Sequence, residues 1–560
     1  FCSCYICMGT MNKTLLRYLQ AEKKMKKIII LLLIGTIFNS CGVFLQNTGV
    51  KNYSPKEKIS QNGINKYQYD FIYLSRILNE GFPEIDSVFP KTDRNIQEKQ
   101  TFDNLSKSDI DNLDFIVQAR KYLSNLKNQH TTIYLKFDFE KVYPFVIHIF
   151  EDNWYLISID RKKDSLLLRK RIRNINGIPT DEIEKKLIDF TFAENKINQQ
   201  YEIRNKQFYN KPEYLKAINV IAQKTESITI TFEDNSVVNL VPTSTDKEIV
   251  ANTIKIKENK ITKFQNETYL YKIYQDKKLG YLQFNKCHDK IDILDGIESY
   301  VKPWLQPIAR SYAKKQFKKE KPSKRIAPYY NPKYPVFKDF VWELIDSLNS
   351  NNIHNLVIDL RNNPGGNLTL GIQLMYFLTD KKDLKGFSEY AYTSEIYKSY
   401  FPDEYQSLKE KHPNGVPQNK LILKEKNLNL FNEITDSTSN YFVPENRPIF
   451  RGDIYILSNY RTGSAAAMLT TLFQDNGIGK VIGTSVGNNP IGATTYTPMK
   501  LPKTKADISI ATTYIERPNK SQGKYQIPDY WIEYCIEDLE SGIDPYWEKV
   551  QELITKKASR

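Results

Sequence analysis

The sequence contains little of what a disulfide framework, a metal centre or a membrane-spanning helix requires. Of its six cysteines, only Cys287 and Cys535 lie beyond residue 41, so no disulfide framework is predicted. The five histidines show no metal-ligand spacing, so we predict neither a metal nor another cofactor. The one long apolar run, residues 28–38, is shorter than the roughly 20 apolar residues that cross a bilayer.

Local concentrations of positive charge are also scarce, although the formal net charge is +15. Most lysines stand singly, and the densest basic segment, 314–325, contains Phe317 as its only aromatic residue. Single-stranded nucleic acid is bound by basic grooves with aromatic side chains between the charges, so no nucleic-acid partner is predicted. The 40% hydrophobic and 12% aromatic contents are typical of a globular protein, long enough for roughly two to four domains.

The N-terminal region has the pattern of a leader. Met25, Lys26 and Lys27 precede the apolar run, which ends at Asn39-Ser40-Cys41-Gly42. This pattern resembles a bacterial lipoprotein signal over residues 25–41, which implies a lipid on Cys41; an uncleaved membrane anchor or an ordinary secretory signal is the alternative. We expect a protein held in the cell envelope, in the outer membrane with a periplasmic or surface face. Residues 1–24 are interpreted as upstream sequence translated by mistake, and the polar residues 42–65 as a tether.

Apolar periodicity divides the rest of the chain into three regions. Helical spacing of residues such as Tyr67, Phe71 and Leu74 predicts an N-terminal helical domain over 66–135. Residues 140–243 combine strand-like runs with a hairpin. Residues 270–550 alternate strands and helices, as an α/β domain does.

Two strand–turn–helix motifs carry the chemistry of the α/β region. In the first, residues 359–367, a buried strand leads into the sequence Asp-Leu-Arg-Asn-Asn-Pro-Gly-Gly-Asn, whose glycines would expose backbone N–H groups to an oxyanion. Alone it would fit a structural turn equally well. In the second, residues 459–466, a strand ends at Gly463-Ser464-Ala465 and a helix follows at once, which is how a fold exposes a serine nucleophile.

In this order, the two motifs resemble those of the C-terminal-processing, or tail-specific, serine peptidases, and the segment 480–493 matches the glycine-rich turn of that family. The resemblance implies a crotonase-like α/β core over 270–550, with Ser464 as nucleophile. It also implies an oxyanion hole formed by the N–H of Ala465 and one N–H at Gly365 or Gly366. The run 172–183 is similar to the strand–turn–helix element of PDZ domains, which implies a PDZ-like domain over 140–243.

The resemblance leaves the general base and its acid to be assigned. Bacterial tail-specific members use a lysine after the serine, but the matching position here is Asn489. A second branch, resembling tricorn protease, takes a histidine from the N-terminal helical region, where this chain has His130-Thr131. An ordinary surface histidine is the alternative reading. The third member is unresolved, since Gln522 stands at the expected position and Glu516 is the nearest acid.

The sequence therefore predicts an envelope-anchored serine endopeptidase that acts on polypeptides through an acyl-enzyme at Ser464. It needs no cofactor and no metal, and its partners are polypeptide substrates and, through the lipid, a membrane. The missing lysine, Ala467 in place of the usual glutamate of the second motif, and Gln522 keep a second reading open. In that reading the chain has the peptidase fold but binds a peptide or another ligand without cleaving it.

Overall fold

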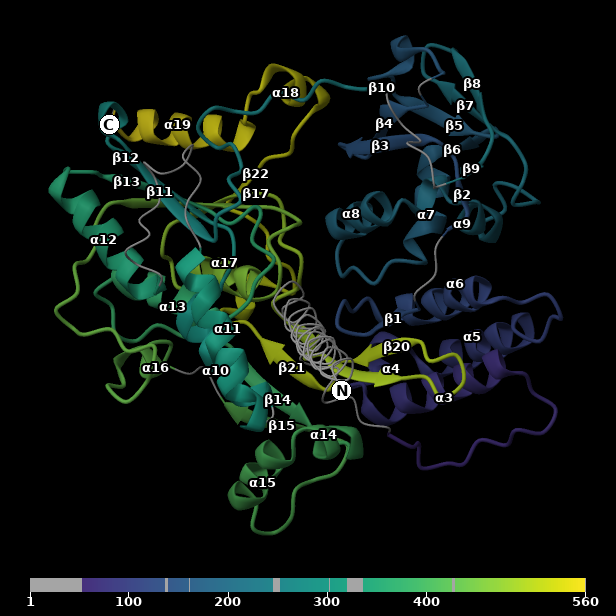
Figure 1. Cartoon of the computed structure of the whole chain (residues 1–560), viewed down its shortest axis with the longest axis horizontal. Coiled ribbons are helices and arrows are strands. Elements are labelled where there is room, and N and C mark those ends of the chain that lie inside the picture. The colour runs from purple at the N-terminus through teal and green to yellow at the C-terminus, as the bar shows by residue number, and fades with distance from the viewer. Residues whose placement is uncertain are drawn as a thin grey trace, which may run out of the picture. The chain divides into compact units, whose positions relative to one another are not determined.

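The computed structural model describes residues 53–135, 139–160, 162–244, 252–301, 303–319, 336–425 and 429–558 (Figure 1). Cys41 and the predicted leader lie outside the described residues. Two compact units can be distinguished, and the described part of the first lies within 290–319. It consists of α10 (Lys290–Tyr300), η5 (Pro303–Leu305) and α11 (Gln306–Lys319). The second unit spans 52–289 and 322–560, and it contains every residue discussed below.

The N-terminal part of the larger unit is helical. Its helices are α3 (Lys66–Gly81), α4 (Ile85–Val88), α5 (Lys91–Asn104), α6 (Asn112–Leu123) and η1 (Ser124–Leu126). A capping box starts α3: the Asn65 side chain accepts from the Gln68 N–H at 2.9 Å, and the Gln68 side chain accepts from the Asn65 N–H at 3.1 Å. This pair satisfies backbone donors that the first turn would otherwise leave unpaired.

This helical segment shares its hydrophobic core with the C-terminal part of the chain. Phe71 and Leu78 belong to one buried cluster with Ile508 and Ile510, which lie far away in sequence. Three strands form the neighbouring sheet, in which β20 (Asp507–Ile510) lies between β1 (Thr132–Tyr134) and β19 (Thr497–Lys500). Packing of the helices on this sheet brings the junction between η1 and β1 to the C-terminal region.

Residues 139–244 surround a second hydrophobic core, which includes Trp154, Ile183 and Ile230. The elements are β2 (Lys141–Val142), β3 (Phe145–Phe150), β4 (Asn153–Ile159), η2 (Ser165–Leu167), β5 (Ile172–Ile175), β6 (Ile178–Pro179), α7 (Thr180–Ile188), α8 (Lys196–Lys206), η3 (Phe208–Asn210), α9 (Pro212–Ala217), β7 (Ile228–Phe232), β8 (Val237–Leu240) and β9 (Thr243–Ser244). One sheet has the order β6-β5-β7-β8, and another has β10 (Asn252–Thr253), β4 and β3. The predicted hairpin is β7–β8, with Thr231 opposite Val237.

A six-stranded sheet forms the centre of the remaining part. Its order is β11 (Tyr269–Tyr274), β12 (Leu279–Phe284), β13 (Asn355–Asp359), β16 (Asp453–Ser458), β17 (Lys480–Gly483) and β22 (Tyr530–Trp531), all parallel except the edge strand β11. Every residue of β12 and β13 is buried, as expected for parallel strands covered on both faces. The helices are α12 (Phe337–Ser350), α13 (Leu368–Phe377), α14 (Glu395–Tyr400), α15 (Pro402–Lys411), α16 (Asn432–Thr435), α17 (Ser464–Asp475), η6 (Lys520–Gln522), α18 (Ile536–Ser541) and α19 (Pro545–Ala558).

A four-stranded antiparallel sheet completes this part, with the order β15 (Leu421–Glu425), β14 (Ser388–Tyr392), β21 (Thr513–Glu516) and β18 (Gly492–Thr494). The central sheet positions the two motifs. Because β13 and β16 are parallel neighbours, with Asp359 opposite Leu457, the turns that follow them meet at one edge of the sheet. Within the described ranges, no helix is long and apolar enough to cross a membrane.

Candidate active site

The turn after β16 presents Ser464 as the first residue of α17, with its side chain exposed. Its φ of +47° lies in the left-handed region, which costs a non-glycine residue roughly 1–3 kcal/mol. Hydrogen bonds hold the turn: Thr462 Oγ1 donates to Leu360 O at 3.0 Å, and the Gly463 N–H donates to Asn363 O at 2.9 Å. A strained serine between a strand and a helix N-terminus is the geometry that exposes a hydroxyl nucleophile.

Both glycines of the first motif lie in backbone conformations that favour glycine, with φ +108° at Gly365 and +132° at Gly366. A Cβ on Gly365 would lie 2.7 Å from Ser464 Cβ and 2.9 Å from the Ala465 nitrogen, so only glycine fits against the serine turn. The Gly365 N–H donates to Asn363 Oδ1 at 2.9 Å, whereas the N–H groups of Gly366 and Ala465 have no acceptor among the described residues. The N–H groups of Gly366 and Ala465 are therefore the ones in these two turns that stay available to an acceptor.

His130 lies between η1 and β1, in a segment tied to the C-terminal part of the chain. The Asn128 side chain donates to Ala493 O at 2.7 Å, and the Gln129 side chain donates to Gly487 O at 2.8 Å. On the other side, Thr131 Oγ1 accepts the N–H of Ala511 at 3.1 Å. Hydrogen bonds of Asn128, Gln129 and Thr131 thus fix the position of His130.

His130 and Ser464 line the same space. A cavity of about 40 Å³ and a groove of about 680 Å³ both have His130, Ser464 and Asn488 in their walls. The smaller cavity has room for about one water molecule, so a peptide chain would occupy the groove. Asn488 connects the two sides: its Oδ1 accepts the Ser464 N–H at 2.7 Å, and its Nδ2 donates to Gln129 Oε1 at 3.4 Å.

Burial lowers the pKa of His130 to about 4. Its Nδ1 is buried and has no hydrogen-bond partner among the described residues. The imidazole is therefore neutral at pH 7, which is the form that can accept a proton from a serine hydroxyl.

The two residues considered from the sequence as a third catalytic member lie elsewhere. Gln522 is exposed at the end of η6. Glu516 accepts from the Tyr390 hydroxyl at 2.6 Å and forms an ion pair with Lys520, also at 2.6 Å. Neither residue lines the cavity that contains His130 and Ser464.

The carboxyl group in this cavity belongs to Glu194, which the sequence reasoning missed. Glu194 lies between α7 and α8, and its Oε2 accepts the Asn489 N–H at 2.6 Å. It also accepts a backbone hydrogen bond from Gln129, next to His130, and burial raises its pKa to about 7. A single glutamate in the loop 189–195 carries no sequence signal of this role. Asn489, which stands at the lysine position of the family, lines the same cavity.

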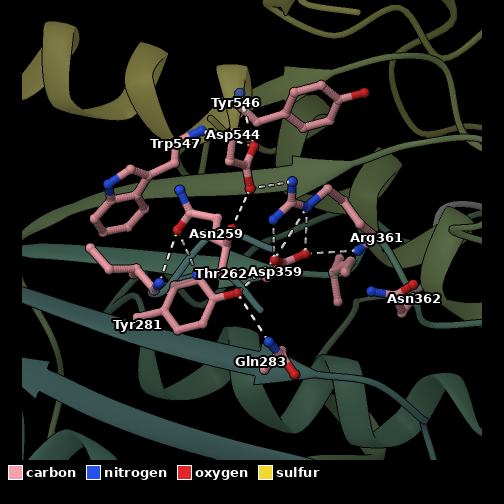
Figure 2. A network of polar contacts seen from close by, with 12 residues as sticks. Asn259, Thr262, Tyr281, Gln283, Asp359, Arg361, Asn362, Asp544, Tyr546 and Trp547 are labelled. Carbon is pink, nitrogen blue, oxygen red and sulfur yellow. Dashed lines mark hydrogen bonds and ion pairs between the residues drawn. The ribbon is translucent and has the colours of Figure 1, made fainter. Parts of the chain in front are cut away.

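The charged residues of the first motif form a buried network (Figure 2). Arg361 pairs with Asp359 at 2.6 Å and with Asp544 at 2.7 Å. The Tyr281 hydroxyl donates to Asp359 at 2.7 Å, and the Thr262 hydroxyl donates to Asp544 at 2.5 Å. This network joins the end of β13 to the start of α19 and holds the first motif in place.

Among the described residues, no group of three or more His, Cys, Asp or Glu side chains is arranged to hold a metal ion. The sequence-based expectation of metal-free chemistry stays a prediction.

A mixed helix and sheet fold, with a strained serine and glycine N–H groups at the edge of a parallel sheet, is typical of a serine peptidase. Residues 333–531 match the model of peptidase family S41, and this match includes both motifs. This match confirms the resemblance to the C-terminal-processing peptidases that the two motifs predicted, and it covers residues 333–531.

Solved structures show the fold over most of the chain. The crystal structure of mature CPAF has a TM-score of 0.52 and 13% identity, and covers 88% of this chain and 97% of its own. Mature CPAF complexed with lactacystin has a TM-score of 0.53 and 12% identity, and covers 88% of this chain and 98% of its own. No curated protein matches the sequence.

Proposed function

We propose that this protein is a serine endopeptidase of the cell envelope that cleaves polypeptides through an acyl-enzyme at Ser464. The observation that carries the proposal is the shared cavity of Ser464 and His130, two residues from opposite parts of the sequence. The match to peptidase family S41 supports the same reaction class.

In this mechanism Ser464 Oγ attacks the carbonyl carbon of the scissile bond, and its proton passes to the neutral imidazole of His130. The N–H groups of Gly366 and Ala465 donate to the oxyanion of the tetrahedral intermediate. The imidazolium then returns the proton to the leaving amine, which leaves an ester on Ser464. Water attacks this ester with His130 again as base and releases the second product.

Glu194 positions the base in this mechanism. It accepts backbone hydrogen bonds from Gln129, next to His130, and from Asn489, which lines the same cavity, so it ties these two segments together. Because these bonds go to backbone N–H groups, Glu194 acts through the position of His130 and not on the reacting atoms.

A fluorophosphonate probe, which reacts with activated serines, tests the catalytic unit. Ser464→Ala should abolish labelling, His130→Ala should reduce it by a factor of roughly a thousand or more, and the double variant should lose no more than Ser464→Ala, since members of one unit are not additive. Ser407→Ala, at an exposed position of α15, and His412→Ala, at the C-terminal end of this helix, are matched controls. Both variants should be labelled like the wild type.

The pH dependence of labelling tests the base separately. A free histidine would give a rise near pH 6.5, but the buried His130 should place the acid limb near pH 4. Label that survives in Ser464→Ala, or a His130→Ala variant that reacts at more than half the wild-type rate, would show that the assignment is wrong.

Two features favour the second candidate, a peptide-binding protein without activity. Asn489 replaces the lysine of bacterial relatives, and His130 Nδ1 has no acceptor among the described residues. A wild-type protein that binds unfolded casein but does not react with the fluorophosphonate would support this candidate over the enzyme.

The envelope location is proposed from the leader pattern, which ends at Cys41. Cys41→Ser should move the protein from the detergent-extracted membrane fraction to the soluble periplasmic fraction. A variant that stays in the membrane fraction would contradict lipid anchoring at this residue.

Residues 140–243 are proposed to bind the carboxyl end of a polypeptide as a PDZ-like domain. Support comes from β6, a two-residue strand at the edge of its sheet that leads directly into α7, where an extended peptide could add a strand. In the full-length Ser464→Ala protein, amidation of a peptide's terminus should weaken its binding, and unchanged affinity would contradict the proposal.

A further inference from the structure

A second cavity continues the groove that contains Ser464. It has a volume of about 460 Å³ and extends between residues of the 139–244 segment and the central part of the chain. Tyr201, Asn362, Tyr460 and Arg461 line both this cavity and the serine groove. A polypeptide lying over Ser464 can therefore reach the second cavity without leaving the groove.

Two arginines meet at Tyr460, on the boundary between the cavity and the groove. The Arg204 guanidinium lies 5.1 Å from the centre of the Tyr460 ring, and that of Arg461 lies 5.9 Å from it. Tyr201 stacks on Tyr460 with ring centres 4.5 Å apart. The aromatic pair supports both guanidinium groups at one place in the wall.

Neither arginine has an ion-pair partner among the described residues. Arg461 is exposed, and its side chain has only a long contact of 3.5 Å from Nη1 to Asn362 Oδ1. Arg361 shows the contrasting case, because two aspartates neutralise it. The charges of Arg204 and Arg461 are therefore available to a ligand.

A histidine orients Arg204 without adding a charge of its own. His148 Nδ1 donates to Ile149 O at 3.0 Å, and its Nε2 accepts a hydrogen bond from Arg204 Nη1. The ring stacks on Phe150 with centres 3.9 Å apart. Burial and the nearby charges of Arg204 and Arg461 lower the pKa of His148 well below its ordinary value, so this ring is neutral.

Among the described residues, the acidic residues in the cavity wall form no ion pair with Arg204 or Arg461 and bind other groups instead. Glu258 pairs with Lys263, Asp544 with Arg361, Asp538 with the Cys535 N–H at 2.9 Å, and Glu533 with the Trp531 indole at 2.7 Å. An anion entering the cavity would find the charges of Arg204 and Arg461 at Tyr460, which also lines the serine groove.

We propose that Arg204 and Arg461 bind a carboxylate of the substrate polypeptide and so direct cleavage to peptides with an acidic group near the scissile bond. Arg461 precedes Ser464 by three residues, so their Cα atoms are at most about 11 Å apart, a span of three or four residues of an extended peptide. This inference rests on the proposed peptidase function. The carboxylate can belong to an Asp or Glu side chain or to the peptide's own C-terminus.

The experiment uses full-length protein and peptides that span the preferred cleavage site in unfolded casein. One glutamate is moved through the positions on both sides of the scissile bond, and each peptide is compared with its glutamine counterpart and with free and amidated C-termini. One placement should raise kcat/KM about 10- to 100-fold over the neutral peptide, the range for charge-assisted hydrogen bonds.

Within each variant the preference is the ratio of kcat/KM for the glutamate peptide to that for the glutamine peptide. Arg461→Met and Arg204→Met should reduce this ratio to less than about threefold, and Arg461→Lys should keep part of it. Arg451→Met removes an exposed arginine elsewhere and should keep the full preference. A preference for glutamate over glutamine assigns the site to a side chain, and a preference for free over amidated peptide assigns it to the terminus. If the preference is lost in Arg461→Met and Arg204→Met, the carboxylate is bound by these arginines and not at β6 of the PDZ-like domain.

No preference for any carboxylate in the wild type, or a preference that survives both substitutions, would overturn the inference. Peptide binding to the Ser464→Ala protein gives a readout that does not need catalysis. An inactive wild-type protein whose Ser464→Ala form still selects acidic peptides through Arg461 would contradict the proposed function but not the carboxylate site.

Discussion

Gly365→Ala would test whether the two motifs form one site. At φ +108°, an alanine is strained by roughly 1–3 kcal/mol whatever space surrounds it. Its Cβ would also lie 2.7 Å from Ser464 Cβ, 2.8 Å from Gly463 O and 2.9 Å from the Ala465 nitrogen. Two of these three atoms are backbone, so the serine turn itself must shift by several tenths of an ångström.

This shift displaces both the nucleophile and the Ala465 N–H. Removal of one oxyanion donor typically lowers kcat by about 10²- to 10³-fold, so we expect at least this loss in peptide cleavage and in fluorophosphonate labelling. The Tm should fall by a few degrees because of the backbone strain.

Gly415→Ala is the matched control. Gly415 has a φ of +99°, close to that of Gly365, but no atom lies within 4 Å of its Cβ position. It should lose similar stability and keep full labelling. If Gly365→Ala labels within about threefold of the wild type, then Gly365 does not pack against the serine turn as described, and the oxyanion site must be sought elsewhere.

The other predictions concern the residues around this site. Glu194→Gln removes the carboxyl group whose pKa is raised: the folded wild type holds this proton up to about pH 7, whereas the unfolded chain releases it near pH 4.5. The free energy of unfolding of the wild type relative to the variant should therefore fall by about 3 kcal/mol as the pH rises from 4.5 to 7. A difference in urea unfolding that stays constant over this range would contradict the burial of Glu194. Asn488→Ala removes the acceptor of the Ser464 N–H and should slow labelling about tenfold, whereas an unchanged rate would show that the turn holds without it. Arg361→Met leaves two buried carboxylates unpaired and should lower the free energy of unfolding by about 3–5 kcal/mol. The control Lys382→Met removes one partner of an exposed ion pair and should change the free energy of unfolding by less than about 1 kcal/mol. Equal effects of the two substitutions would argue against a buried network.

The local geometry of the two motifs follows from the sequence. Gly365 and Gly366 are needed where φ is positive, and an apolar strand followed by Gly463-Ser464 predicts a sharp turn into a helix. These features depend on interactions between neighbours in the chain, so the amino-acid sequence is enough to predict them. The resemblance to the C-terminal-processing peptidases follows from the same two motifs and is confirmed by the family match over residues 333–531.

The partners of the serine depend on tertiary structure. His130 reaches the cavity because the N-terminal helices share a core with residues 499–511, and Glu194 reaches it from a loop in a different segment. Sequence reasoning placed His130 by resemblance and left the third member unresolved, with Gln522 at the expected position and Glu516 as the nearest acid. Neither residue lines the cavity.

Sequence also could not provide the electrostatic state of these groups. The pKa of His130 falls to about 4 and that of Glu194 rises to about 7, in both cases because burial disfavours the charged form. Similarly, Arg204 and Arg461 become a pair only where Tyr201 stacks on Tyr460. Turns are determined by a residue and its neighbours, whereas burial and the pairing of charges depend on segments that only the folded chain brings together.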